Sequence, residues 1–206
     1  MKEIFTRNID INKTSFLNWR TSKNSDIENI LVLAEGYLDS SIELAKFCLK
    51  DNRDKKADIL IFPILANANH GIELYLKSLV WILNKLLGSK QKIEGNHNIK
   101  QILDNLKVKI RKYKGQSTLN SFNKRTANLQ NYVTELFTRI NATLENDNMD
   151  FSRYPLNKNY INHFYVDEFS NVEIDLENLL IRFQEIKECL DEIAYHYFDQ
   201  ELNQEW

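Results

Sequence analysis

The chain has 206 residues, of which 43% are apolar, and its formal net charge is -2. The 5 glycines and 2 prolines are too few for the many tight turns of an all-β fold, and the length allows one domain with a continuous core. We therefore expect an all-α protein, built as a single up-down bundle of about five long helices.

Residues 1–24 are expected to form an N-terminal arm, and residues 25–206 the helical bundle. The arm is polar with scattered large apolar side chains and no sustained helical period. We expect it to dock its aromatic side chains on the bundle, with one short helical turn near residues 15–20. Apolar residues then keep a helical spacing to about Lys50, which predicts the first long helix.

Residues 57–88 are the stretch around which the other helices are expected to pack, because they are apolar on nearly every side. The polar exceptions share one side of this helix, at spacings of three, four and seven residues: Asn69, His70, Glu73, Lys77 and Asn84. Such side chains are costly to desolvate without partners. The stripe is therefore expected either to face a cleft or to meet polar groups of other helices.

The second half of the chain predicts three more helices. The third opens with possible capping side chains at residues 96–98 and stops at Gly115, and the fourth covers residues 117–144. Residues 160–174 contain two aromatic and β-branched runs that are compatible with a small β-hairpin lying against the bundle. The fifth helix is expected from Val172 nearly to Trp206.

Charge is distributed unevenly along the second half of the chain. Residues 100–125 contain eight basic residues and one acidic residue, whereas residues 167–206 contain twelve acidic residues and two basic residues. Two solvated helix faces that attract each other would explain this pattern. Alternatively, the basic segment contacts a phosphate backbone. The candidate nucleic-acid-binding residues are Lys107, Lys109, Arg111, Lys112, Lys114, Lys124 and Arg125.

Three short motifs carry a family resemblance. Residues 69–79 read NHGIELYLKSL, residues 95–100 read GNHNIK, and residues 151–155 read FSRYP. Together they resemble the HEPN superfamily of prokaryotic helical domains, in members where an E-L-x-L-K helix precedes G-H-x-[LI]-K and F-x-R-Y-P. The chain departs from this pattern at Asn96, which separates Gly95 from His97.

The resemblance covers roughly residues 30–194 and implies a four- or five-helix up-down bundle that forms a homodimer. It also implies a role in toxin–antitoxin, CRISPR-associated or abortive-infection systems, with RNA or protein as the partner. Many members cut RNA without a metal. Those ribonucleases carry an arginine followed, after four to six residues, by a histidine, and no arginine precedes any of the four histidines here at that distance.

The missing pair favours a non-catalytic binding or assembly module. The alternative is a metal-independent endoribonuclease with a displaced catalytic constellation, whose candidate residues are His70, Glu73, Lys77, His97 and Arg153. In such an enzyme His70 or His97 would act as the base, and Lys77 or Arg153 would stabilise phosphate charge.

Each candidate also has a structural interpretation. Glu73 and Lys77 stand in the favourable order for an intrahelical ion pair, so they could specify the core rather than line a cleft. His97 is expected to satisfy a helix end. Arg153 is expected to bind backbone carbonyl groups or the acidic helix that carries Glu185 and Glu188.

No HExxH, CxxC, P-loop or GxGxxG motif occurs, so we expect neither a metal site nor a cofactor. The longest apolar runs are too short for a membrane span. The 2 cysteines lie inside helical patterns and fit a reducing environment, which predicts a cytoplasmic location.

Overall fold

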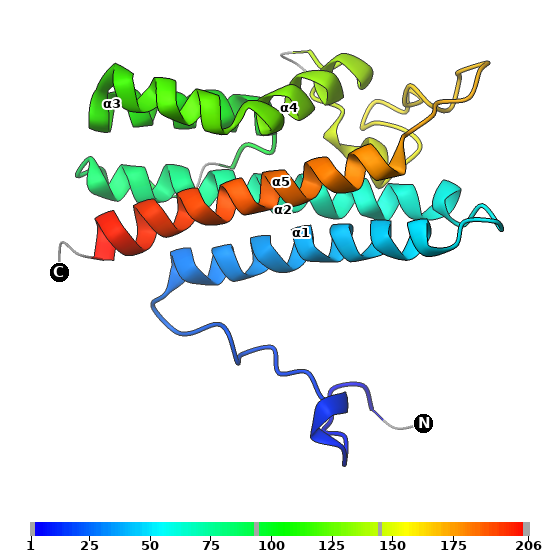
Figure 1. Ribbon diagram of the computed structural model, residues 1–206, viewed down its shortest axis with the longest axis horizontal. Helices are drawn as coiled ribbons and strands as arrows, with labels where there is room; N and C mark the ends of the chain where they lie inside the picture. Colours follow the sequence, from blue (N-terminus) through cyan, green and yellow to red (C-terminus); the bar gives the residue numbers. More distant parts are fainter. Residues whose placement is uncertain (1–2, 93–94, 144–145, 204–206) are drawn as a thin grey trace.

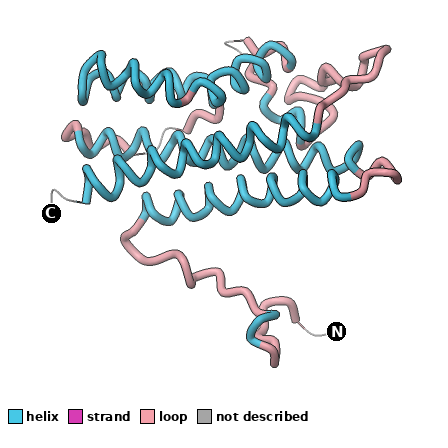
Figure 2. Tube along the Cα trace, viewed as in Figure 1, coloured by secondary structure: helices cyan, strands magenta, loops and turns pink. Residues whose placement is uncertain are grey.

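The computed structural model describes residues 3–92, 95–143 and 146–203, and within these residues it contains helices but no strands (Figures 1 and 2). The all-α prediction is therefore confirmed. The long helices are α1 (Asp26–Lys50), α2 (Ala57–Leu86), α3 (Ile99–Arg125), α4 (Ala127–Arg139) and α5 (Leu176–Tyr195). The shorter helical turns are η1 (Ile11–Lys13), η2 (Met149–Ser152) and η3 (His196–Leu202).

Helix α2 is the centre of the bundle, with α1 on one side, α3 on the other and α5 alongside (Figure 1). Helices α1 and α2 approach closely at Gly71, where a Cβ atom would lie 3.0 Å from the carbonyl oxygen of Ala34. Among the described residues, α2 is the one helix long and apolar enough to cross a membrane. Its position among three other helices accounts for that composition.

The chain reverses direction within α3 at Gly115, whose φ of 85° lies in the left-handed region that glycine adopts without strain. The Nζ atom of Lys100 lies 6.0 Å from the ring of Phe137, whereas Lys114 pairs with Glu201 at the far end of the bundle. The predicted stop at Gly115 is thus confirmed. An additional break at Thr126 was not predicted, and α4 ends at Arg139, so the prediction that this helix continues to Leu144 was too long.

The segment between η2 and α5 corrects the β-hairpin expected near residues 160–174. In the described part of the chain it contains a single isolated bridge, between Leu156 and Asn162. Phe164 and Tyr165 pack against the core instead of forming a strand pair, and the ring of Tyr165 lies 5.2 Å from that of Phe62 on α2. Helix α5 also begins at Leu176 rather than at Val172, because Asp175 provides its N-cap.

The N-terminal arm does not dock on the bundle, so that expectation was wrong. It leaves the start of α1 and extends away from the other helices (Figure 1). Within residues 3–24 its one helical turn is η1, and residues 15–20 contain turns and bends instead of a helix. Trp19 is 79% exposed. Without a helical period, the arm cannot present a continuous apolar stripe to a neighbouring helix.

Candidate functional site

The candidate site is centred on Glu73, whose carboxylate is held inside the bundle by α2 and by the residues before α3. Glu73 and Lys77 are only 8% and 7% exposed. Oε1 of Glu73 lies 2.8 Å from Nζ of Lys77 and 2.9 Å from Nδ1 of His97. Its Oε2 lies 3.8 Å from Nδ1 of His70. We call these four residues the Glu73 cluster.

The carboxyl group of Glu73 is ionised at neutral pH. Burial raises its pKa, but contacts with His70, Lys77 and His97 outweigh that effect and lower the pKa from 4.5 to about 2. A carboxylate can only accept a hydrogen bond, so Nδ1 of His97 carries the proton and donates it. Among the described residues Nε2 of His97 has no hydrogen-bond partner, so it can accept a proton from another molecule.

The two histidines open the cluster to solvent. The side chain of His97 is 71% exposed, and that of His70 is 43% exposed. The ring of Tyr37 on α1 meets the His70 ring edge to face at 4.5 Å and fixes its orientation. The cluster therefore has a sealed inner ion pair and two accessible imidazoles, an arrangement that can support proton transfer at the surface.

The position of His97 differs from the sequence-based expectation. Asn98, not His97, caps α3, because its side chain accepts a hydrogen bond from the backbone N–H of Gln101 at 3.0 Å. His97 instead reaches across to Glu73 on α2. The sequence contained both residues as candidates, but no local signal indicated that they would meet.

The other polar residues of the α2 stripe have separate structural partners. Oδ1 of Asn69 accepts a hydrogen bond from the hydroxyl of Tyr132 at 2.7 Å. Nδ2 of Asn84 donates to the carbonyl oxygen of Gln91 at 3.2 Å. The stripe thus contains one cluster that reaches solvent and two asparagines that connect α2 to neighbouring segments.

Arg153 does not join the Glu73 cluster. It follows η2 in a segment that packs on Phe62, eleven residues before Glu73 and thus roughly 16 Å away along α2. Its guanidinium makes no hydrogen bond or ion pair within the described residues. The expected contact with the acidic helix is also absent there, since Glu185 accepts a hydrogen bond from Asn128 instead.

The basic segment of α3 is partly neutralised by the acidic C-terminal helix. Lys114 pairs with Glu201 at 3.0 Å, and Arg125 pairs with Glu192. Lys107 pairs with Asp104 within its own helix, at 3.6 Å. These contacts support the interpretation in which the two oppositely charged segments attract each other. Four candidates have no ion pair in the described part of the chain: Lys109, Arg111, Lys112 and Lys124.

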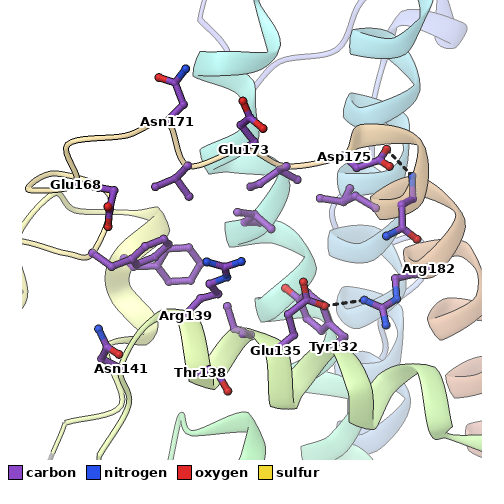
Figure 3. A pocket seen from close by; sticks show the side chains of 18 of the residues that line it. Tyr132, Glu135, Thr138, Arg139, Asn141, Glu168, Asn171, Glu173, Asp175 and Arg182 are labelled. Atoms are coloured by element: carbon purple, nitrogen blue, oxygen red, sulfur yellow. Dashed lines mark hydrogen bonds and ion pairs between the residues drawn. The ribbon is translucent and has the colours of Figure 1, made fainter.

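A pocket of about 1040 Å³ opens between α4, the segment before α5 and the first turns of α5, and we call it the α4–α5 pocket (Figure 3). Its floor is apolar and includes Leu65, Phe151 and Phe183. Its rim is charged: Glu135, Arg139, Glu168, Glu173, Asp175 and Arg182. The sequence-based search for sites missed this pocket, because its lining comes from segments far apart in the chain.

Among the described residues, no group of three His, Cys, Asp or Glu side chains is placed to hold a metal ion. The fold and the two surface features define a helical-bundle protein with a histidine-flanked carboxylate and a separate pocket. No protein-family model, no curated protein and no solved structure matches the sequence. The function is therefore argued from geometry and charge.

Proposed function

We propose that this chain is a non-catalytic binding and assembly module with a HEPN-like bundle, acting in a prokaryotic defence or toxin–antitoxin system. The helical architecture and the three motifs at residues 69–79, 95–100 and 151–155 support the choice of system. The observation that carries the assembly role is the N-terminal arm, which presents large apolar side chains to water.

Several side chains of the arm would gain from a partner surface. Ile9, Leu17 and Trp19 are almost fully exposed. Burying one large apolar side chain contributes roughly 1.5–3 kcal/mol, so exposing several of them in one segment leaves a large gain available to a binding partner. Exposed apolar patches mark interaction sites in folded proteins, and in the arm Phe16 and Trp19 lie side by side, with ring centroids 6.0 Å apart.

The cationic side chains without ion pairs support contact with nucleic acid as part of the same role. Lys109, Arg111 and Lys112 lie close together near the end of the first half of α3. Lysine and arginine bind phosphate groups by releasing condensed counterions, and this binding is independent of base sequence. The paired residues Lys114 and Arg125 would contribute less, because their charges are already compensated.

Expression in a bacterial host tests the assembly role. We expect the wild-type chain to reduce phage plating or host growth, Trp19→Ser to abolish the effect, and His97→Ala to retain it. Western blotting confirms that the three chains reach equal levels. An active Trp19→Ser chain, or a wild-type chain without any effect, would contradict the proposal.

The contact between Glu73 and His97 favours a second candidate, a metal-independent endoribonuclease. A buried carboxylate that orients an exposed imidazole is a common device for general base catalysis. In this scheme Nε2 of His97 takes the proton of a ribose 2′-hydroxyl, and the 2′-oxygen attacks the adjacent phosphorus. The 5′-oxygen leaves with a proton from the imidazolium of His70, and a 2′,3′-cyclic phosphate forms.

Incubation of the purified chain with labelled RNA in EDTA tests this second candidate. Cutting that disappears in both His97→Ala and His70→Ala would establish it and remove the non-catalytic proposal. A wild-type chain that leaves the RNA intact would remove the ribonuclease. An Arg153→Ala chain serves as a control, since Arg153 lies away from the Glu73 cluster.

A further inference from the structure

We propose that the N-terminal arm of one chain inserts its aromatic segment, residues 16–19, into the α4–α5 pocket of a second copy of the chain. The inference rests on the proposed assembly role and names the partner. It combines three observations: an apolar segment of the arm in water, a pocket with an apolar floor, and a distance that prevents the two from meeting within one chain.

The docking segment is compact and basic. Phe16 and Trp19 form an aromatic pair with ring centroids 6.0 Å apart, and Leu17 lies exposed between them. From Lys13 to Lys23 the chain carries three basic residues and no acidic one. This segment therefore offers an apolar cluster with positive charge beside it.

The α4–α5 pocket has the complementary character. Its floor is formed by buried side chains, and Val172 and Ile174 add apolar surface to its wall. Its rim carries four carboxylates and two arginines, and Arg182 is already paired with Glu135 at 2.8 Å. Three carboxylates then remain against the one guanidinium of Arg139, so the rim is net acidic and favours the basic segment of the arm.

Arg139 adds a specific partner for an indole ring. Figure 3 shows its side chain projecting from α4 into the pocket, beside an aromatic ring of the floor. Its guanidinium has no ion pair among the described residues. A cation in this position attracts the face of a tryptophan ring, and arginine is the most common cation in such contacts.

The arm cannot place this segment in the pocket of its own chain. Ser22 is tied to α1, because its N–H donates to Oδ1 of Asn29 at 2.9 Å and its carbonyl oxygen accepts from Nδ2 of Asn29 at 2.8 Å. Phe16 precedes Ser22 by six residues, and Trp19 by three, so they reach roughly 20 Å and 10 Å from that point.

The pocket lies beyond this reach. The 3.5 Å ion pair between Asp39 and Lys187 aligns α1 with α5, and the two helices run antiparallel, since Ser25 lies beside Asp199. Asp39 lies ten residues after Asn29 on α1, and Leu179 lies eight residues before Lys187 on α5. Because the helices are antiparallel, these two steps run the same way along the bundle and their lengths add. These eighteen residues correspond to roughly 27 Å along the bundle, and the arm lies on the α1 side, away from α4 (Figure 1). A second copy removes this restriction.

Mixing two complementary variants of the full chain tests the inference. Trp19→Ser removes the arm anchor and keeps the pocket, whereas Ile174→Arg blocks the pocket and keeps the arm. By sedimentation velocity we expect the wild type to self-associate and each variant alone to associate roughly tenfold or more weakly. A mixture of the two variants should form a mixed complex, because it pairs an intact arm with an intact pocket.

Two matched variants control for nonspecific effects. Ile59→Ser changes an apolar residue of α2 that is 75% exposed and lies outside both the arm and the pocket, and Ile181→Arg changes an exposed residue of α5 outside the pocket. Both should associate as the wild type does, and circular dichroism checks that every variant is folded. A monomeric wild type, an unchanged Trp19→Ser chain, or a mixture without mixed complexes would overturn the inference.

The outcome also separates the inference from the proposed assembly role. If Trp19→Ser abolishes the effect in the bacterial host but the purified chain does not self-associate, the arm binds a different partner and only the second-copy inference fails. If Trp19→Ser leaves the effect in the host unchanged, the assembly role itself fails.

Discussion

In the Glu73 cluster charged side chains lie inside the bundle, whereas in the N-terminal arm large apolar side chains lie in water. Glu73 and Lys77 are almost fully buried, and Trp19 is 79% exposed. Residue chemistry alone would assign the two regions the opposite way. The comparison shows that position on a periodic helical face decides burial here. The surrounding helices then supply charged partners for Glu73, but they supply no apolar surface for the arm.

The two regions also differ in how far other contacts compensate for their environment, which is burial for the charged groups and exposure to water for the apolar ones. The carboxylate of Glu73 gains hydrogen bonds from Lys77 and His97, which compensate for its removal from water. The aromatic residues of the arm gain only each other, through the contact between Phe16 and Trp19. The first region is complete within one chain, and the second becomes complete through the contact proposed above.

The largest effect is expected from Glu73→Gln, which should lower the free energy of unfolding by about 3 kcal/mol at pH 7, since it leaves Lys77 buried without a counter-charge. The folded-state pKa of Glu73, about 2, lies below its ordinary value of 4.5. The contribution of the carboxylate is therefore present above pH 4.5 and is lost as the pH falls toward 2.

Urea unfolding of the wild type and of Glu73→Gln, from pH 7 downward, measures the difference between their free energies of unfolding. This difference should shrink below pH 4.5. The matched control is Glu43→Gln, since Glu43 also pairs with a lysine on its own helix, at 2.7 Å, but 69% of its side chain is exposed. That change should cost less than about 1 kcal/mol. Equal losses of stability for the two substitutions would show that the burial of Glu73 does not strengthen its ion pair.

A smaller effect is expected where α1 and α2 approach beside the cluster. A Cβ atom at Gly71 would lie 3.0 Å from backbone atoms of Ala34 and Leu38, so Gly71→Ala should destabilise the fold by about 1–2 kcal/mol. At Gly36 on α1 no atom beyond the neighbouring residues and backbone of its own helix lies within 4 Å of the added Cβ, so Gly36→Ala should stabilise by about 0.5–1 kcal/mol. Thermal unfolding measures both, and shifts of the same sign would contradict the close approach.

The smallest effect is expected in the arm. Trp19→Ser should change the free energy of unfolding of the monomer by less than about 0.5 kcal/mol, because the exposed indole contacts little of its own chain. Denaturant unfolding at low protein concentration measures this value. A loss of 2 kcal/mol or more would place Trp19 in the core of its own chain and remove the contrast between the two regions.

Local patterns were reliable guides to the helices. The apolar period to Lys50, the apolar stretch at residues 57–88 and the stop at Gly115 all correspond to observed elements. The aromatic residues near 160–174 were misleading, since they predicted a hairpin but belong to an irregular segment, from which Tyr165 packs on Phe62 of α2. Aromatic composition reports a need for burial, which strands and loops can meet equally well.

The candidate site was only partly predictable. The α2 stripe identified Glu73, His70 and Lys77 because helical spacing places them on one face. The meeting of His97 with Glu73, the separation of Arg153 from both, and the α4–α5 pocket depend on how loops and distant helices lie against α2. No short-range pattern contains that information.

The sequence by itself determined which segments are helices and which polar residues share a face, because hydrogen bonding and side-chain periodicity within a helix are local. The tertiary structure alone decided that the Glu73 cluster is sealed on one side and open at two histidines, and that the arm stays outside the bundle. Those outcomes depend on contacts between residues far apart in the chain, whose geometry is set only when the whole core packs.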